Sequence, residues 1–244
     1  MKPYKAFILG LIGAVWGTPV HAFCIEKSVS ETPYIVCRFD PQRVNIRTHL
    51  LDAQGKPYGN LGRYIDASKR NGSAPIFAMN GGMYDEANWP VGLYIEQQRT
   101  LKPANRAGGY GNFHLKPNGV FAISGGKAVV QSTQDYLSSR LKADFATQSG
   151  PMLVIKNQLH PRFSAASASR KIRNGVGIAT NGDVIFAVSR RAVTFADFAL
   201  LFRDHLNCAN ALYLDGTISS IYAPEIGISE IFWPFGPIIA IASR

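Results

Sequence analysis

The sequence predicts an α+β fold, a single domain with a mixed or antiparallel β-sheet core and a few packed helices. Short runs of β-branched, aromatic and apolar residues recur along the chain, and many are separated by Gly, Pro, Asn or Asp, as strands joined by turns require. Only a few stretches have helical spacing. No internal repeat or long polar linker divides the sequence, so one domain is the simplest organisation.

The first 22 residues have the three-part layout of a secretory signal peptide. Lys2 and Lys5 precede an apolar run from Ala6 to Trp16, and small residues end the segment at Ala22. The apolar run is too short to span a bilayer. We therefore predict cleavage after Ala22 and a secreted protein, periplasmic or extracellular, formed by residues 23–244.

The remaining chain is basic but has no clear nucleic-acid site. Residues 23–244 hold 24 Lys and Arg against 16 Asp and Glu, a formal charge of +8. This charge favours anionic partners, yet the basic residues are scattered and form no recognisable nucleic-acid motif. We expect no nucleic acid as a partner and no stable membrane insertion after signal cleavage. A lipid anchor on Cys24 is the alternative, which Phe23 disfavours because a small residue should stand there.

Three cysteines remain after the leader. Cys24 and Cys37 flank two short expected strands that turn around Glu31 and Pro33, and a hairpin would bring their ends together. We predict a disulfide between them. Cys208 is then unpaired, and its position after a helical segment predicts a small buried hydrophobic residue rather than a reactive thiol.

The expected helices and strands follow from spacing and turn residues. The clearest helix spans 194–206, where Thr194 can cap the first turn and Asp197 occupies the third position. A second helix is expected at 60–72, ending at Gly72, and a third at 134–143. The strand-like runs are 34–39, 43–51, 75–80, 91–96, 119–123, 128–132, 151–155, 175–179, 183–189 and 210–214.

Two of these strand-like runs end in the same way. Asn80 leads into two glycines, and Asp215 leads into another. A polar side chain followed by glycine lets the backbone turn sharply and offer its N–H groups to an anion. Each motif alone is an ordinary turn signal. The pair, together with Arg173 before a further strand, favours a site that holds something anionic.

Familiar cofactor and metal motifs are missing from the sequence. It has no Walker P-loop, dinucleotide fingerprint, HExxH, paired CxxC or GxSxG motif. Four histidines follow the leader, and none has metal-ligand spacing to another; His114 is the one of most interest for a site. We predict neither a cofactor nor a metal.

Four motifs, taken together, resemble the phosphodiester glycosidase family. They are "MNGGMY" (79–84), "QSGPMLV" (148–154), "RNGVGIA" (173–179) and "LDGTISSIYAP" (214–224), and they lie in the order of the family. "PVGLYIE" and "GNFHLKPNGVF" are similar to its bacterial secreted branch. Thr217 departs from the pattern, because the family usually carries a further glycine or two after Asp-Gly.

The resemblance implies a hydrolase that cleaves a glycosyl phosphodiester, a sugar-1-phosphate diester, in an envelope or extracellular glycopolymer. Asp215 would activate water or stabilise the cationic sugar. Arg173 would hold the phosphate with its planar fork, and Asn80 would complete the catalytic set. The expected substrate-binding residues are Gly81, Gly82, Gly216, Ser219, Ser220, His114 and Asp85, with amide donors supplied by 80–82.

Two alternatives stay open at this point. Asp85 and Glu86 could reach the same pocket as the loop after Asn80, although each is more simply explained as a solvated turn charge. The second alternative concerns function: a non-catalytic envelope module could use the pocket to bind sugar phosphates. Such a module needs only donors and stacking aromatic residues, whereas a hydrolase also needs a carboxylate near the sugar carbon. In a hydrolase or in a binding module, the residues expected to stack on the sugar are Tyr84, Tyr94 and Tyr110.

Overall fold

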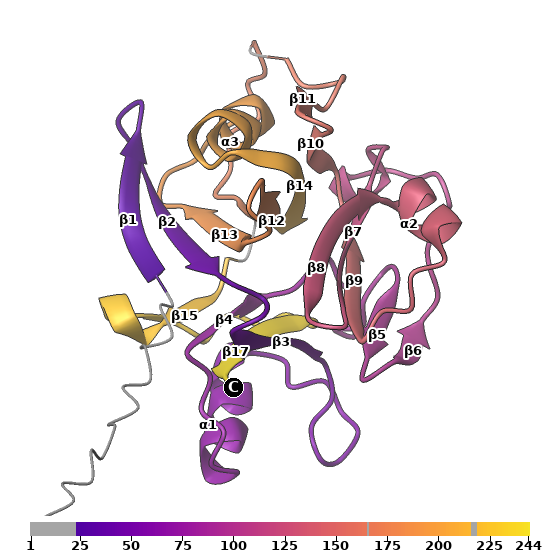
Figure 1. The fold of residues 1–244 in the computed structure, drawn as a ribbon, viewed down its shortest axis with the longest axis vertical. Coiled ribbons are helices and arrows are strands. Elements are labelled where there is room, and N and C mark those ends of the chain that lie inside the picture. The colour runs from indigo at the N-terminus through magenta and orange to yellow at the C-terminus, as the bar shows by residue number, and fades with distance from the viewer. Residues whose placement is uncertain (1–22, 165, 216–218) are drawn as a thin grey trace, which may run out of the picture.

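Antiparallel β-sheets form the core of the protein in the computed structural model, which describes residues 23–164, 166–215 and 219–244 (Figure 1). The largest sheet has the order β1-β2-β13-β12-β14-β10-β11. Its strands are β1 (Phe23–Val29), β2 (Thr32–Phe39), β13 (Val184–Ser189), β12 (Asn174–Ala179), β14 (Cys208–Asp215), β10 (Met152–Ile155) and β11 (Gln158–Leu159).

Two five-stranded sheets complete the described part of the core. One has the order β16-β15-β4-β17-β3, with β16 (Ile228–Glu230), β15 (Ile221–Ala223), β4 (Phe77–Asn80), β17 (Ile238–Ser243) and β3 (Val44–His49). The other has the order β6-β5-β9-β7-β8, with β6 (Arg99–Lys102), β5 (Tyr94–Glu96), β9 (Phe145–Ser149), β7 (Gly119–Ser124) and β8 (Lys127–Ser132). The predicted α+β class with an antiparallel core is confirmed.

Phe186 marks the place where the three sheets meet. Its ring, on β13, lies 5.1 Å from that of Phe77 on β4 and 5.9 Å from that of Phe121 on β7, measured between centroids. All three side chains are at most 1% exposed. Burying each such side chain stabilises the fold by about 1.5–3 kcal/mol, so this contact fixes the sheets relative to one another.

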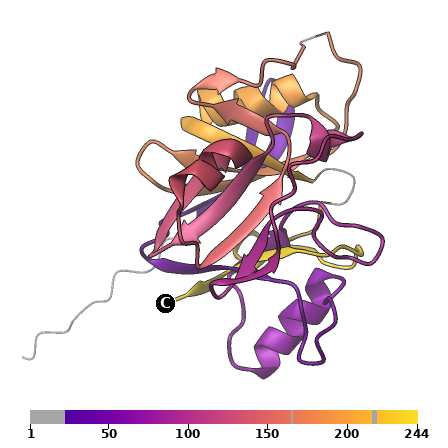
Figure 2. The same cartoon turned by 90° about the vertical axis from the view of Figure 1, so that its right-hand side faces the viewer.

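The helices cover the outside of this β core. In Figures 1 and 2, α1 (Leu61–Arg70) and α3 (Phe195–Leu200) lie at opposite ends of the molecule, while α2 (Thr133–Ser139) lies beside the third sheet. Shorter helical turns are η1 (Asn112–His114), η2 (Leu201–His205) and η3 (Pro224–Ile226). None of the helices within the described residues is long and apolar enough to cross a membrane.

The three predicted helices are present, with changes in two of them. The helix expected at 134–143 ends at Ser139, because Arg140 adopts the left-handed conformation with φ +54. The helix that begins after Thr194 changes in form. The expected capping box is present: Thr194 Oγ1 accepts from the Asp197 N–H, and the Asp197 carboxylate accepts from the Thr194 N–H. The α-helix ends at Leu200, and a wider π-helical turn, η2, continues to His205. Phe198 and Phe202, four residues apart on one face of this segment, are fully buried.

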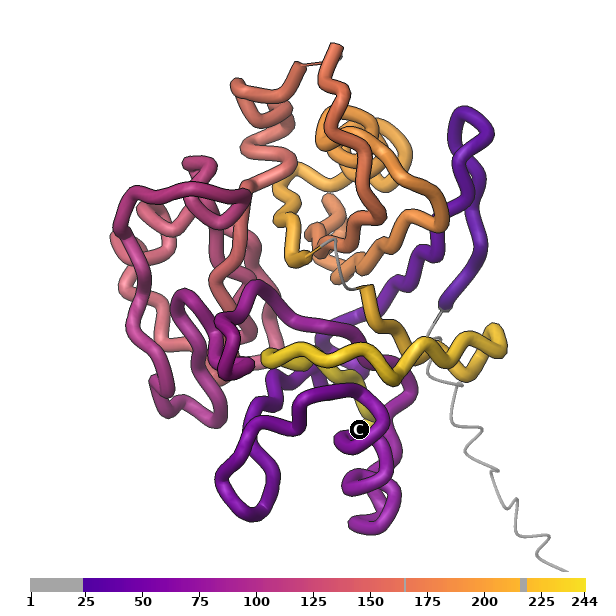
Figure 3. The backbone as a smooth tube through the Cα atoms, turned by 180° about the vertical axis from the view of Figure 1, so that it is seen from behind, coloured from indigo at the N-terminus to yellow at the C-terminus, as the bar shows by residue number. Residues whose placement is uncertain are grey.

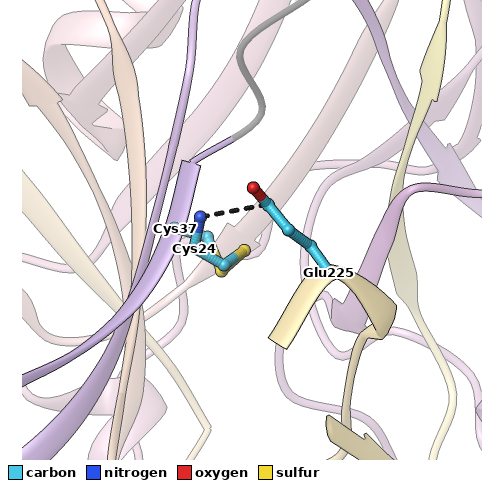
Figure 4. Close-up of a disulfide and its surroundings, with 3 residues drawn as sticks. All are labelled: Cys24, Cys37 and Glu225. Atoms are coloured by element: carbon cyan, nitrogen blue, oxygen red, sulfur yellow. Dashed lines mark hydrogen bonds between the residues drawn. A yellow bond between two sulfur atoms is a disulfide. The ribbon is translucent and has the colours of Figure 1, made fainter. Parts of the chain in front are cut away.

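The predicted disulfide joins Cys24 and Cys37 (Figure 4). These residues face each other in the β1–β2 hairpin, whose turn has positive φ at Ser30 and Glu31. The Cys24 N–H also donates to the Glu225 carboxylate at 3.3 Å, which ties the hairpin to η3. Cys208 is unpaired and 1% exposed, as expected, and burial raises the pKa of its thiol to about 12.

Candidate active site

The ends of three strands meet at the side chain of Asn174, the first residue of β12. Asn174 Nδ2 donates to Asn80 Oδ1 at the end of β4, at 2.7 Å. Asn174 Oδ1 accepts from the backbone N–H of Asp215 at the end of β14, at 2.8 Å. Strands β12 and β14 are neighbours in one sheet, whereas β4 belongs to another. Asn174 therefore brings the two glycine-ended strands predicted from the sequence to one place.

Strand β9 of the third sheet supports both of these strand ends. Thr147 Oγ1 donates to the Gly81 carbonyl at 2.6 Å, and Ser149 Oγ donates to the Leu214 carbonyl at 2.8 Å. Both hydroxyl side chains are fully buried. The "QSGPMLV" segment thus begins in the strand that holds Gly81 and Leu214 in position.

The orientation of the Asn80 amide is fixed by its partners. Asn80 Oδ1 accepts from Asn174 Nδ2 and, at 3.2 Å, from the Ser220 N–H. Asn80 Nδ2 must therefore point elsewhere. This nitrogen and the Ser220 hydroxyl are both buried, and neither has a hydrogen-bond partner within the part of the chain that the structure describes. The site thus holds two buried polar groups that a ligand could satisfy.

Two tyrosines lie close to the Asp215 carboxylate. Burial, and then the negative charge of Asp215, raises the pKa of Tyr84 to about 12. The pKa of Tyr213, two residues before Asp215 on β14, is raised by the same two causes in the same order. The positive charge of Arg173 lowers the pKa of Tyr213. Asp215 and Arg173 are therefore both near Tyr213.

Arg173 is held more tightly than a surface phosphate clamp would be. The residue is 1% exposed, and its guanidinium carbon lies 3.6 Å from the centroid of the Phe195 ring. Nε donates to the Val193 carbonyl at 2.9 Å and Nη2 to the Ser169 carbonyl at 3.1 Å. Nη1 makes no hydrogen bond of good geometry among the described residues, although the Tyr213 hydroxyl lies close to the guanidinium. From the sequence we expected the guanidinium to offer two N–H groups to a phosphate. In the structure, backbone carbonyls take Nε and Nη2, and only the buried Nη1 is left for a ligand.

The glycine loop after β4 also differs from expectation. The N–H of Gly81 donates to the Pro237 carbonyl at 2.6 Å, and that of Asn80 to the Ser220 carbonyl at 3.4 Å. These two groups are therefore not the amide donors for an anion that we expected. Gly82 has φ +133, and an added Cβ would lie 2.8 Å from Thr147 Oγ1, so only glycine fits there.

The remaining predicted site residues have mixed surroundings. Ser219 Oγ accepts from Asn174 Nδ2 at 3.4 Å, which places it beside the three strand ends. His114 is partly buried, and its Nδ1 lies 3.2 Å from the Ala107 carbonyl. Asp85 is exposed and accepts from the N–H groups of Ala87 and Trp89, so it stabilises a turn. Gly216 and Thr217 lie outside the described residues.

The three tyrosines predicted to stack on a sugar differ in how exposed they are. Tyr84 lies near Asp215 and is partly buried. Tyr110 is fully exposed. Tyr94 is 0% exposed in the core, so it has no ring face to offer a sugar, and the prediction for it was wrong.

Sequence reasoning missed Asn174, Tyr213 and Asn112. Asn174 stands in the quoted "RNGVGIA" motif, but only the neighbouring Arg173 was predicted to be a site residue. Tyr213 lies in an apolar run that predicts only a strand. The Asn112 side chain, in η1, lies near the Tyr213 hydroxyl, whose pKa it lowers, and so brings this turn to the site. Within the described ranges, no group of three or more His, Cys, Asp or Glu residues could hold a metal ion.

The fold and the four motifs define a phosphodiester glycosidase domain, and the chain belongs to the phosphodiester glycosidase family. The family profile matches residues 73–234, which include all three strand ends of the site. The chain is 38% identical over 205 residues to YigE of Escherichia coli (strain K12), a protein described as uncharacterized. That match covers 84% of this chain and 80% of YigE.

Two solved structures share the fold. One is the zebrafish N-acetylglucosamine-1-phosphodiester alpha-N-acetylglucosaminidase catalytic domain, auto-inhibited by its pro-peptide, with a TM-score of 0.64 and 15% identity. The match covers 94% of this chain and 85% of the zebrafish domain. The other is a hypothetical protein from Synechocystis, with a TM-score of 0.58 and 13% identity. This match covers 91% of this chain but only 61% of the Synechocystis protein, which is less than two thirds of that protein's length.

Proposed function

We propose that the protein is a secreted hydrolase that cleaves a glycosyl phosphodiester in an envelope or extracellular glycopolymer. The observation that carries the proposal is the pair of Asn174 hydrogen bonds, which bring Asn80 and Asp215 together from strands of different sheets. Family membership over residues 73–234 supports the same reaction class.

Asp215 is the carboxylate of this proposal. It activates water or stabilises the oxocarbenium-like sugar while the bond from the sugar carbon to the phosphate oxygen breaks. The leaving group is a phosphate monoester, which needs less help from a general acid than a sugar hydroxyl does. The hydroxyls of Tyr84 and Tyr213 are protonated at neutral pH, and burial raises their pKa values further. The Tyr84 proton is donated to the Pro234 carbonyl, so Tyr213 is the tyrosine of the two that can donate to the substrate.

Three buried groups bind the substrate's polar atoms in this scheme. They are Asn80 Nδ2, Ser220 Oγ and Arg173 Nη1, which have no partner in the described part of the protein. A buried polar group without a partner costs about 1–3 kcal/mol, and sugar hydroxyls or phosphate oxygens would remove that cost. Arg173 would also supply positive charge from behind Tyr213.

Export accompanies the proposed function. The segment 1–22 has the signal-peptide layout, and the Cys24–Cys37 disulfide suits an oxidising compartment. The mature protein should begin at Phe23. N-terminal sequencing of the periplasmic or medium fraction tests this, and a mature fraction that begins at Met1 would contradict it.

The activity is tested with a panel of sugar-1-phosphate diesters incubated with the mature protein, with the products identified by mass. We expect release of the free sugar from at least one diester. If the parent protein cleaves none but binds sugar phosphates, the non-catalytic binding module is the correct function.

Replacement of the carboxylate tests the mechanism. Asp215→Asn keeps the shape of the side chain and the backbone N–H bond to Asn174, so the fold should be unchanged. We expect kcat to fall by about a hundredfold or more, the scale of losing a positioned general base. Asp66→Asn, on the exposed side of α1, is the matched control and should retain parental kcat. Parental turnover by Asp215→Asn would exclude the proposed role.

A further inference from the structure

Two consecutive large aromatic residues are exposed in the segment between β16 and β17. Phe232 is 81% exposed and Trp233 is 61% exposed. Large aromatic residues are usually buried, and neighbouring exposed ones mark an interaction surface. We call this pair the aromatic platform.

The backbone under the aromatic platform is pinned on both sides. The Ile231 carbonyl accepts from the Gly62 N–H at 3.1 Å, and the Phe235 N–H donates to the Gly59 carbonyl at 2.8 Å. Phe235 itself is 0% exposed and anchors the segment in the cluster around α1. The rings are thus displayed from a fixed support, which lowers the entropy lost when they bind a partner.

This segment is continuous with the candidate active site. The Tyr84 hydroxyl donates to the Pro234 carbonyl, next to Trp233, at 3.0 Å. The same Tyr84 responds to the charge of Asp215. A second link follows at Pro237, whose carbonyl accepts from the Gly81 N–H. Figure 3 shows the yellow C-terminal part of the chain lying across the purple segments that contain β4 and α1.

Positive charge lies beside the backbone segment that carries the aromatic platform. The Arg63 guanidinium is near Gly59: a Cβ built on that glycine would lie 3.9 Å from Arg63 Nη1. Arg63 is exposed. Arg190 pairs with Glu230, the last residue of β16, so its charge is already balanced. An aromatic surface on a segment that also lies near the charge of Arg63 suits a sugar ring that belongs to an anionic chain.

We propose that Phe232 and Trp233 form a stacking subsite for a sugar ring of an anionic glycan, the ring that lies next to the phosphodiester held at Asp215. This inference rests on the proposed function. The C–H face of a pyranose ring is apolar and flat, so it packs on an aromatic face and removes both from water. The subsite would make the enzyme prefer a phosphodiester within a glycan chain over one with a small alcohol.

The test compares two substrates that differ only beyond the phosphate. One is N-acetylglucosamine 1-phosphate esterified with methanol, and the other carries chitotriose in place of methanol. In the double variant Phe232→Ala/Trp233→Ala we expect KM for the chitotriose diester to rise about tenfold, equal to about 1.4 kcal/mol. The kcat and KM for the methyl diester should be unchanged. Equal effects on both diesters, or none on either, would overturn the proposal.

A matched control removes another exposed apolar side chain. Leu137 on α2 is 39% exposed, and Leu137→Ala should change neither KM. Self-association is checked by sedimentation of parent and double variant. If the parent dimerises and the variant does not, the platform is a contact between copies of the chain and the glycan proposal is wrong.

A binding measurement separates failure of the platform from failure of the proposed function. Trp89 and Trp233 are the tryptophans after residue 22, so Trp89→Phe leaves Trp233 as the sole tryptophan reporter of the mature protein. If the parent cleaves neither diester, the chitotriose diester should still quench Trp233 fluorescence saturably, and the methyl diester should not. Quenching by neither diester would overturn the subsite.

Discussion

Two buried polar clusters in this protein differ in how completely their hydrogen bonds are satisfied. Gln148, on β9, is 1% exposed, and all its main hydrogen-bonding positions are used. Its Oε1 accepts from the N–H groups of Leu93 and Asn105, each at 2.9 Å. Its Nε2 donates to the Asn105 carbonyl at 2.8 Å and to Thr133 Oγ1 at 3.1 Å. This side chain joins three segments and has no capacity left for a ligand.

The cluster around Asn174 is equally buried but incomplete. Asn80 and Ser220 are 0% exposed, yet Asn80 Nδ2 and Ser220 Oγ have no partner in the described residues. Buried polar groups in folded proteins are nearly always satisfied, so such exceptions require an explanation. The comparison teaches that complete satisfaction identifies a structural polar residue, while incomplete satisfaction near a carboxylate identifies a candidate for ligand binding.

The largest effect on stability should come from the satisfied cluster. Gln148→Met keeps the length of the side chain but leaves the N–H groups of Leu93 and Asn105 without acceptors. Each unsatisfied group costs about 1–3 kcal/mol, so we expect the free energy of unfolding to fall by roughly 2–4 kcal/mol. Urea denaturation measures this change. A loss below about 0.5 kcal/mol would show that the comparison does not separate the two clusters.

Ser220→Ala tests the incomplete cluster, where we expect an effect on substrate binding and none on stability. The hydroxyl makes no hydrogen bond within the described structure, so its removal should leave the free energy of unfolding unchanged or slightly higher. Loss of one hydrogen bond to the substrate should raise KM by roughly tenfold, about 1.4 kcal/mol. Urea denaturation and steady-state kinetics on the cleaved diester check the two halves. Destabilisation with unchanged KM would make Ser220 a structural residue.

Glu96 sharpens the comparison, because its carboxyl is also incompletely satisfied but lies outside the candidate site. Its Oε1 is buried and unpartnered in the described structure, and burial raises the pKa of the carboxyl from 4.5 to about 7. The folded state therefore holds a proton that the unfolded chain releases. This contribution to stability is fully present below pH 4.5 and is lost as the pH rises through about 7.

Glu96→Gln should remove that pH dependence. Buried His49 changes stability in the opposite direction, because burial lowers its pKa to about 4, so the difference between variant and parent is the informative quantity. We expect Glu96→Gln to gain stability relative to the parent between pH 4.5 and pH 7, measured as Tm. An equal Tm difference at both pH values would show that Glu96 does not titrate in this range.

Much of the fold was predictable because most strands here alternate or are continuously apolar between turn residues. Strand β9 was missed for a physical reason: Thr147, Gln148 and Ser149 are polar in sequence but at most 1% exposed in the structure. Their hydrogen bonds, which no local pattern reveals, make that burial possible. Tyr94 failed as a stacking residue for the related reason that aromatic side chains are often used in cores.

The site was predictable in part. The glycine-ended strands indicated Asn80 and Asp215, and the structure brings their ends together. The bridging role of Asn174 depends on two sheets meeting, which sequence spacing cannot express. The same is true of Arg173, whose carbonyl partners lie at Ser169 and Val193 and leave one nitrogen rather than a free fork. The roles of all these residues in catalysis stay predictions until the variants are measured.

The position of β17 has a consequence for how the protein is made. This last strand lies between β3 and β4, and the Pro237 carbonyl just before it fixes Gly81 beside the site. Strand β4 therefore lacks both of its pairing partners, β15 and β17, until residues 221–243 have been synthesised. Contacts between such distant segments form slowly. The candidate site should consequently form late in folding, after β15 and β17 have paired with β4.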